Sequence, residues 1–128
     1  MAISSSRDLL LPCPQCSELF DYELWRIIDS SERPDLLAKV LDGSIHTREC
    51  PACHHQDTIN APLLLFRPDA TPNLIFSPAS QTNPDEDRED ATRLINQVRQ
   101  SLADRWQDRW LETAVSLPRA FLPTALTE

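Results

Sequence analysis

Apolar and acidic residues alternate with the period of a β-strand soon after residue 18. In "ELFDYELWRII", Phe20, Tyr22 and Leu24 are separated by acidic residues, a pattern typical of a strand with one buried face. The alternation breaks at Trp25, Ile27 and Ile28, which indicates a β-bulge. Two later apolar runs, "APLLLF" and "PNLIFS", flank the turn-forming "RPDATP" and predict two further strands that pair antiparallel.

Between these strands, apolar residues recur at helical spacing. The stripe consists of Leu36, Leu37, Val40 and Leu41. Pro34 suits the first helical position, and Gly43, the only glycine of the chain, suits the residue just past the helix end. Because Arg33 is a poor N-cap, Ser30 or Ser31 could instead cap a slightly longer helix.

A longer helical pattern begins within the polar, acidic stretch 78–90. Asn83 is a suitable N-cap, Pro84 a suitable first residue, and Glu86 stands three residues after the cap. We expect one helix from here to just before Pro118, up to about nine turns long. Its apolar stripe consists of Ala91, Leu94, Ile95, Val98, Leu102, Trp106 and Trp110. This face should pack on the sheet, on a second copy or on a protein partner, because two tryptophans need burial.

Composition and charge narrow the class of protein. The chain has 128 residues, with 12 basic against 20 acidic side chains and a formal net charge of -8. This charge opposes binding to nucleic acids, whose protein partners usually carry a clustered positive face. No apolar run reaches the length of a membrane span or of a secretory signal, so we expect a cytoplasmic protein. In that compartment, paired cysteines are more often metal ligands or redox groups than disulfides.

The four cysteines form two copies of one motif. These are Cys13-Pro-Gln-Cys16 and Cys50-Pro-Ala-Cys53, separated by residues 17–49. Each Cys-x-x-Cys can wrap a tight turn that directs both sulfurs to one point. Two such turns would supply four thiolates in the tetrahedral arrangement that structural zinc prefers. The sequence therefore predicts a site in which all four cysteines bind Zn²⁺, with iron as the less favoured metal.

Other interpretations of these motifs stay open. Cys50, Cys53 and His54 have the spacing of a c-type haem attachment site, but the only methionine is the initiator, so the usual second ligand is missing. A thioredoxin-type redox pair expects one motif at a strand-to-helix junction, whereas this motif is doubled and followed by strand-like sequence. His46 and His55 also lie near the second motif, yet four cysteines already complete a tetrahedral shell. Such a closed shell has no position for water or substrate, so we expect no enzymatic activity.

The order of motifs along residues 11–78 carries further information. A Cys-Pro-x-Cys motif is followed by "ELFDYELWRIID", the helical "RPDLLAKVLDGSI", a second Cys-Pro-x-Cys and the apolar "APLLLFRPD". This order resembles the bacterial CpXC domain. The resemblance implies that Cys13, Cys16, Cys50 and Cys53 are metal ligands, and it implies no particular activity. The chain departs from such motifs at His54, where glycine is common, because histidine adopts a positive φ less readily.

We therefore expect an α+β fold in two parts. Residues 1–80 would form a small antiparallel, zinc-ribbon-like sheet with an inserted short helix. Residues 81–128 would form a linker, a long C-terminal amphipathic helix and an apolar tail that could lead into a further domain. The metal would hold the first part together as a non-enzymatic protein-interaction or regulatory module, with a protein partner or self-association through the Trp106 and Trp110 side. The alternatives are a thiolate–zinc site that responds to oxidants and a nucleic-acid-binding zinc ribbon.

Overall fold

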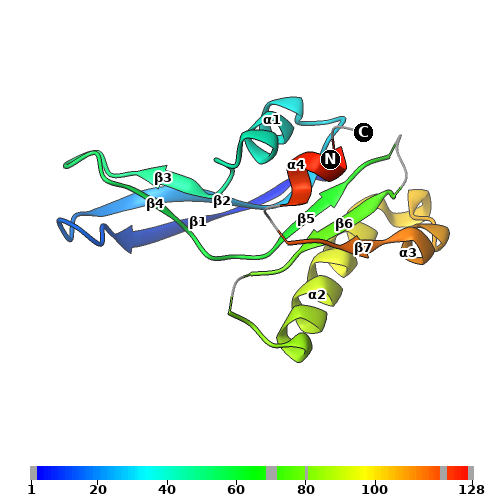
Figure 1. The fold of residues 1–128 in the computed structure, drawn as a ribbon. Helices are drawn as coiled ribbons and strands as arrows, with labels where there is room; N and C mark the ends of the chain where they lie inside the picture. Colours follow the sequence, from blue (N-terminus) through cyan, green and yellow to red (C-terminus); the bar gives the residue numbers. More distant parts are fainter. Residues whose placement is uncertain (1–2, 69–71, 80, 119–120, 127–128) are drawn as a thin grey trace.

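A computed structural model describes residues 3–68, 72–79, 81–118 and 121–126 (Figure 1). These residues form an α+β protein in which helices lie on both faces of a five-stranded sheet. The strands, in their order across the sheet, are β1 (Ser5–Pro12), β2 (Leu19–Asp29), β5 (Leu63–Phe66), β6 (Leu74–Ser77) and β7 (Val115–Ser116). The α+β class is therefore as predicted.

The sheet is mixed, which corrects the expected small antiparallel sheet. The β5–β6 pair is antiparallel, as predicted. In contrast, β2 and β5 run parallel, with Ile28 opposite Leu65, because the chain between them crosses over through helix α1 (Pro34–Asp42). β7 adds a second parallel pairing, with Ile75 opposite Val115. Apolar runs predict strands, but they do not predict which distant strands share an edge.

β1 pairs with β2 over its whole length, and the sequence pattern did not predict this strand. Its three leucines are consecutive, so they lack the alternation that marks a strand with one buried face. The predicted bulge is present in the partner strand. Ser5 lies opposite Ile27 and Ser6 opposite Trp25, which leaves Arg26 as the extra residue of β2.

The β1–β2 hairpin extends beyond the rest of the sheet as an arm (Figure 1). A second hairpin, in which β3 (Thr47–Glu49) pairs with β4 (Gln56–Thr58), lies along it. The Tyr22 hydroxyl donates a hydrogen bond to the Ile45 carbonyl oxygen at 3.0 Å, which ties the first hairpin to the segment that leads into the second. We call residues 8–23 and 46–58 together the arm, and the rest of the described chain the body.

Helix α1 ends as its sequence predicts. Gly43 has a φ of 83°, in the left-handed region that glycine adopts without a steric penalty. The N–H groups of Gly43 and Ser44 donate to the carbonyl oxygens of Val40 and Lys39, at 3.3 and 2.9 Å. The single glycine of the chain therefore forms the helix stop, and it satisfies carbonyl groups that the last turn would leave unpaired.

The start of α1 corrects one expectation. Neither Ser30 nor Ser31 caps the helix, which begins at Pro34 directly after Arg33 and has no side-chain cap. Instead, the Asp29 carboxylate accepts hydrogen bonds from the N–H (2.9 Å) and the hydroxyl (2.7 Å) of Ser31 and holds the turn before the helix. A proline at the first position has no N–H group to satisfy, so a missing cap costs little here.

Helix α2 (Pro84–Leu102) begins as predicted. Asn83 Oδ1 accepts a hydrogen bond from the Glu86 N–H at 2.8 Å, and the Asn83 amide donates to Glu86 Oε1 at 3.0 Å. Three acidic residues in the first turn, Asp85, Glu86 and Asp87, lie at the positive end of the helix dipole, and their negative charges stabilise it. None of the described helices is long and apolar enough to cross a membrane.

The expected long C-terminal helix is wrong, since the longest helix is α2 in the middle of the chain. The residue after α2 has a φ of 53°, and the chain continues as η1 (Ala103–Arg105) and α3 (Arg109–Thr113) instead of running helically to Pro118. This bend brings the Trp110 ring to 5.0 Å from the Phe66 ring. On a straight helix the drifting stripe would have carried both tryptophans off the sheet, so burial of Trp110 decides against a longer helix.

The core has two parts, one on each face of the sheet. Alternate residues of β5 and β6 point to opposite faces, which explains their unbroken apolar runs. The part beneath α2 and α3 consists of Ile3, Ile27, Leu64, Phe66, Leu74, Phe76, Leu94, Val98, Leu102 and Trp110. The part beneath α1 and α4 (Leu122–Leu126) consists of Ile28, Leu36, Val40, Ile45, Leu63, Leu65, Ile75 and Leu122. Both parts lie in the body.

The predicted division of the chain into a zinc-ribbon-like part, residues 1–80, and an appendage, residues 81–128, stays a prediction. In the structure, residues on both sides of this position share one core, with Ile27 before it and Val98 after it. The apolar tail also takes part in the body, because Leu122 is fully buried beneath α1.

Candidate metal centre

The first cysteine motif forms the tight turn that connects β1 to β2. The Cys13 N–H donates to the Glu18 carbonyl oxygen, and the Ser17 N–H donates to the Cys13 carbonyl oxygen, both at 2.9 Å. Ser17 completes the turn with a φ of 66°. The Gln15 N–H also points to the Cys13 sulfur at 3.4 Å, so the turn presents a backbone donor to a thiolate.

The second motif forms the same turn between β3 and β4. The Cys50 N–H donates to the His55 carbonyl oxygen, and the His54 N–H donates to the Cys50 carbonyl oxygen, again at 2.9 Å. His54 has a φ of 63° and occupies the place that Ser17 has in the first turn. The departure from glycine at His54 therefore leaves the turn intact, and the duplicated sequence motif is a duplicated structure.

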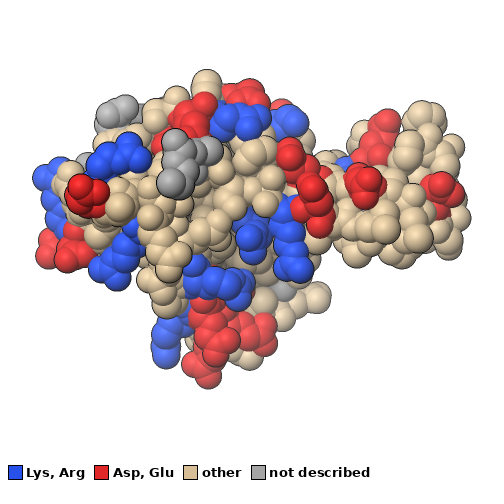
Figure 2. All heavy atoms as spheres, turned by 180° about the vertical axis from the view of Figure 1, so that it is seen from behind, with Lys and Arg blue, Asp and Glu red and all other residues tan. Residues whose placement is uncertain are grey.

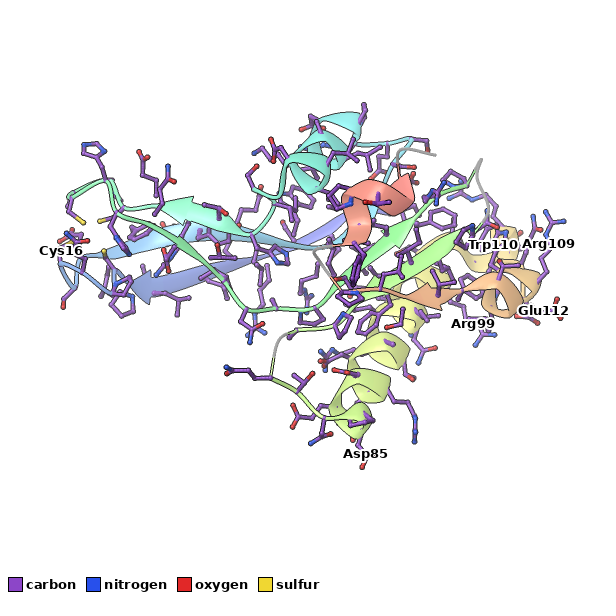
Figure 3. The ribbon with its side chains drawn as sticks, in the orientation of Figure 1. Cys16, Asp85, Arg99, Arg109, Trp110 and Glu112 are labelled. Carbon is purple, nitrogen blue, oxygen red and sulfur yellow. The ribbon has the colours of Figure 1, made fainter. Side chains whose placement is uncertain are left out.

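The two turns meet at the tip of the arm and bring the four cysteine sulfurs together. Cys13 Sγ lies 3.6 Å from Cys53 Sγ, Cys16 Sγ lies 3.5 Å from Cys50 Sγ, and all four sulfurs lie within 4.8 Å of one another. Figure 3 shows these sulfurs around the labelled Cys16. A tetrahedron with metal–sulfur bonds of about 2.3 Å has sulfur–sulfur edges of about 3.8 Å, whereas a disulfide requires about 2.0 Å. The donor set therefore fits one metal ion, and the cysteines are unpaired as disulfides.

The four ligand candidates differ in their access to solvent. Cys13 and Cys50, the first residue of each motif, are buried, while Cys53 is partly exposed and Cys16 is exposed. The first cysteine of each motif continues a strand, whereas the last one lies in the turn. One side of the candidate site therefore faces the interior of the arm and the other side faces solvent.

Backbone donors determine which thiol loses its proton first. Desolvation would raise the pKa of Cys13, but the N–H groups of Cys16 and Gln15 outweigh it and, with the neighbouring thiols, lower the pKa to about 6. Cys13 is therefore largely a thiolate at neutral pH even without a metal.

Two other thiols, those of Cys16 and Cys53, resist ionisation at the site. The Glu18 N–H favours the Cys16 thiolate, yet desolvation and the neighbouring sulfurs outweigh it and raise the pKa of Cys16 to about 12. The His55 N–H likewise favours the Cys53 thiolate, but desolvation and nearby sulfurs raise that pKa as well. Like charges this close cannot gather without a cation, so a bound metal would have to displace protons.

The three histidines stand outside the sulfur cluster. His46 is buried, with Nε2 at 2.7 Å from the Trp25 carbonyl oxygen, so its ring is engaged in the body. His54 Nδ1 lies 3.4 Å from the Glu49 carboxylate on the surface. His55 is exposed. Among the described residues, the group that could hold a metal consists of the four cysteines.

Sequence reasoning missed Arg48, which lies behind the candidate site. Its side chain is only 3% exposed, and its guanidinium carbon lies 4.5 Å from the Phe20 ring centroid. It donates to the carboxylate of Asp57 at 2.9 Å and to the carbonyl oxygens of Leu11 and Pro12, at 3.3 and 2.9 Å. The only sequence signal is a basic residue next to Glu49, two positions before Cys50. Arg48 thus joins both hairpins just below their cysteine turns.

The predicted partner face of Trp106 and Trp110 lies mostly within the body. Trp110 is 7% exposed and packs edge-on against Trp106, with 5.4 Å between the ring centroids. Arg99 lies over the Trp106 ring at 5.3 Å, and Figure 3 shows Arg99 and Trp110 at the end of the molecule opposite the sulfurs. Contact with a partner or a second copy through the partly exposed Trp106 stays a prediction.

Comparison with protein families identifies the chain. No curated protein and no solved structure gives a significant match. A family model described as CpXC protein matches residues 11–121, which include both cysteine turns, the arm except for residues 8–10, and most of the body. The match extends beyond the resemblance over residues 11–78 and takes in α2, α3 and β7. The chain belongs to the CpXC family.

Proposed function

We propose that this CpXC chain is a structural zinc-binding module without enzymatic activity, in which one Zn²⁺ ion closes the arm so that it can serve in protein interaction or regulation. The observation that carries this proposal is the convergence of four cysteine sulfurs within 4.8 Å of one another. They come from two turns with the same hydrogen bonds, as expected for a symmetric four-thiolate site.

The ligands would be Cys13, Cys16, Cys50 and Cys53. Thiolates are soft donors, and a tetrahedral four-sulfur set is suited to zinc or iron. We favour zinc because a structural site needs a cation that stays bound without redox chemistry. Four protein ligands leave no position for a water molecule or a substrate, which supports a role in holding structure.

The arm is the part of the protein that needs the metal. Both core clusters lie in the body, so the arm has little apolar burial of its own. Arg48 links its two hairpins by hydrogen bonds, and Tyr22 ties the first hairpin to Ile45 at its base. At the tip, the polar contacts between the two cysteine turns are those between their sulfurs. Metal binding worth about 10–16 kcal/mol in small zinc peptides would be ample to close such a tip.

Elemental analysis of the purified protein tests this proposal directly. We expect one zinc per chain, with little iron, and loss of the zinc in the Cys50→Ser variant. Replacement of the metal by cobalt(II) should give the visible absorption of a tetrahedral thiolate complex. A protein that holds no metal after purification in reducing buffer and binds none on addition of zinc would contradict the proposal.

A second candidate function is a site that responds to oxidants, and the exposure of Cys16 favours it. The Cys16 thiolate attacks one oxygen of hydrogen peroxide, so that an S–O bond forms, the O–O bond breaks, and a sulfenic acid and hydroxide result. Condensation of this sulfenic acid with the Cys50 thiol, 3.5 Å away, forms a disulfide and releases water, so two thiols are oxidised and one peroxide is reduced. Loss of two ligands would free the zinc. Reversible zinc release at low peroxide concentration would support this function, and zinc retention would exclude it.

Nucleic-acid binding has the least support among the alternatives. The arm carries six acidic side chains, Asp8, Glu18, Asp21, Glu23, Glu49 and Asp57, and a single basic one, Arg48. Arg48 is buried and occupied by Asp57 and two carbonyl groups. Phosphate backbones require accessible basic side chains, which the arm does not offer.

A further inference from the structure

The arm has one covered face and one open face. Cross-strand neighbours share a face, so Leu11 and Phe20 point to the same side, the side of the β3–β4 hairpin and Arg48. The burial of β1 and β2 alternates along the arm in the same sense. The open face therefore consists of the intervening pairs, which are Asp8 with Glu23, Leu10 with Asp21, and Pro12 with Leu19.

Two leucines on this open face are unusually exposed. Leu10 is 60% and Leu19 is 57% exposed, and they lie on adjacent strands next to Pro12. Exposed apolar side chains that occur singly are ordinary, but two neighbours beside a proline form a continuous apolar patch. The patch lies directly below the first cysteine turn, where a metal would hold the strands in place.

The surroundings of this patch are strongly acidic. Asp8 lies directly opposite Glu23, and Asp21 lies opposite Leu10. No ion pair joins these three carboxylates to another described residue. Figure 2 shows the arm as a lobe with acidic side chains, while the basic side chains gather on the body. Directly opposed like charges destabilise a strand pair, and no ion pair within the described chain offsets them on this face.

We propose that the open face of the arm docks an extended protein segment that carries basic and apolar side chains. The apolar side chains cover Leu10, Leu19 and Pro12, and the basic ones pair with Asp8, Asp21 and Glu23. A bound zinc would add about two further negative charges from its four thiolates, which strengthens the attraction. This inference deepens the proposed function, on which it rests, by naming the class of partner.

An extended segment also suits the backbone of the arm. β1 is an edge strand of the sheet, so its outward backbone groups form no strand pairing among the described residues. Because Arg48 donates to the carbonyl oxygens of Leu11 and Pro12, the free part of this edge in the arm is residues 8–10. A partner strand can add to such an edge while its side chains reach the adjacent face. A second copy of this chain would instead bring two acidic faces together, and nucleic acid would meet the same repulsion.

The test uses three synthetic peptides and the zinc-loaded protein. The first peptide alternates lysine with leucine, the second lysine with serine, and the third glutamate with leucine. Binding is followed by NMR amide shifts. We expect the lysine–leucine peptide to bind most tightly and to shift the amide signals of residues 8–12 and 19–23. Its affinity should fall as salt is added.

Leu10→Ser and Leu19→Ser should each lower the affinity for the lysine–leucine peptide about tenfold, since each removes apolar contact worth roughly 1.4 kcal/mol of binding free energy. Asp21→Lys should weaken it as well. Leu41→Ser and Leu111→Ser are matched controls, because these leucines are 36% and 43% exposed on the body and should leave the affinity unchanged. Equal binding of the lysine–serine peptide, shifts confined to the body, or dimerisation that Leu10→Ser abolishes would overturn the proposal.

Zinc content measured on the same samples separates the two proposals. Loss of peptide binding with zinc still bound would refute the docking surface alone. A protein that never holds zinc would refute the proposed function, whatever the peptides do. Leu10 and Leu19 are mostly exposed, so their serine variants should keep both the zinc and the fold.

Discussion

The guanidinium of Arg48 donates a hydrogen bond to the carbonyl oxygen of Pro12 across 2.9 Å. This contact joins the strand that enters the first cysteine turn to the strand that enters the second. Because Arg48 is buried and also bound to Asp57, it holds the two hairpins in register from below, while the sulfurs meet at the tip. The candidate metal site is therefore supported by a polar contact that is remote in sequence.

Arg48→Lys should destabilise the zinc-loaded protein by about 2–4 kcal/mol, measured by denaturant unfolding. A lysine keeps the charge but cannot serve Asp57 and two carbonyl groups at once. Arg33→Lys is a matched control, because Arg33 also lies over an aromatic ring and pairs with Asp35, but on the surface. The control should change stability by less than about 1 kcal/mol, and equal effects of the two variants would argue against a special role for Arg48.

Removal of the metal should loosen the arm and leave the body folded. Both core clusters lie in the body, whereas the arm is closed by its sulfurs and a few hydrogen bonds. Hydrogen exchange with and without a chelator should therefore accelerate amides of residues 8–23 and 46–58 far more than those of β5 and α2. Cys50→Ser should reproduce this pattern. Uniform acceleration across the chain would mean that the metal stabilises the whole protein.

Zinc affinity should rise steeply with pH. At neutral pH the Cys13 thiol is already largely ionised, since its pKa is about 6, but Cys16 and Cys53 keep their protons because their pKa values are raised. Zinc must displace those protons, so the logarithm of the binding constant should increase by roughly two or more per pH unit near neutrality. Chelator competition at several pH values measures this slope. A slope near zero would indicate that the thiols are ionised before the metal arrives.

While its cysteine turns stay together, the metal-free protein has its own pH dependence. The folded pKa of Cys13 is depressed from 9.0 to about 6, so its contribution to stability is present above about pH 9 and is lost as the pH falls through 6. The folded pKa of Cys16 is raised to about 12, so its contribution is present below about pH 9 and is lost as the pH rises through 12. The stability of the protein after metal removal by a chelator, measured by denaturant unfolding between about pH 6 and pH 12, should follow both trends. The Cys13→Ser variant should no longer lose stability as the pH falls through 6.

His54→Gly should stabilise the second cysteine turn by about 0.5–1 kcal/mol. The histidine has a φ of 63°, a left-handed conformation that costs non-glycine residues about 1 kcal/mol or more. Its contact with Glu49 is exposed and contributes little. His55→Gly is the neighbouring control, since His55 is not among the described residues with positive φ, and it should give no gain. Thermal unfolding of the zinc-loaded variants compares the two.

Trp110→Ala should destabilise the body by about 3–5 kcal/mol, because the ring is buried and packs on Phe66. Leu111→Ala should cost much less, since that side chain is 43% exposed. Zinc content should be unchanged in both variants, as the site lies at the far end of the arm. If Trp110→Ala had only a small effect on stability, Trp110 would be an exposed residue and would be available to a binding partner.

The sequence by itself determined the local features of this protein. The two cysteine motifs, the stop at Gly43, the capping box at Asn83 and the strands around 63–66 and 74–77 all depend on residues close together in the chain. Hydrogen bonds and dihedral preferences act over a few residues, so their residue types are sufficient to predict them. The same holds for the choice of the four candidate ligands, because each Cys-x-x-Cys motif places its two cysteines in one turn.

Tertiary structure decided how these features are combined. The parallel pairing of β2 with β5, the bend after Leu102 and the buried position of Arg48 each depend on partners far away in the sequence. The helical pattern that could have continued to Pro118 ends at Leu102, and beyond this bend Trp110 is buried against Phe66. Long-range burial outweighs local propensity wherever the two disagree, and only the folded chain reveals which distant surfaces are available.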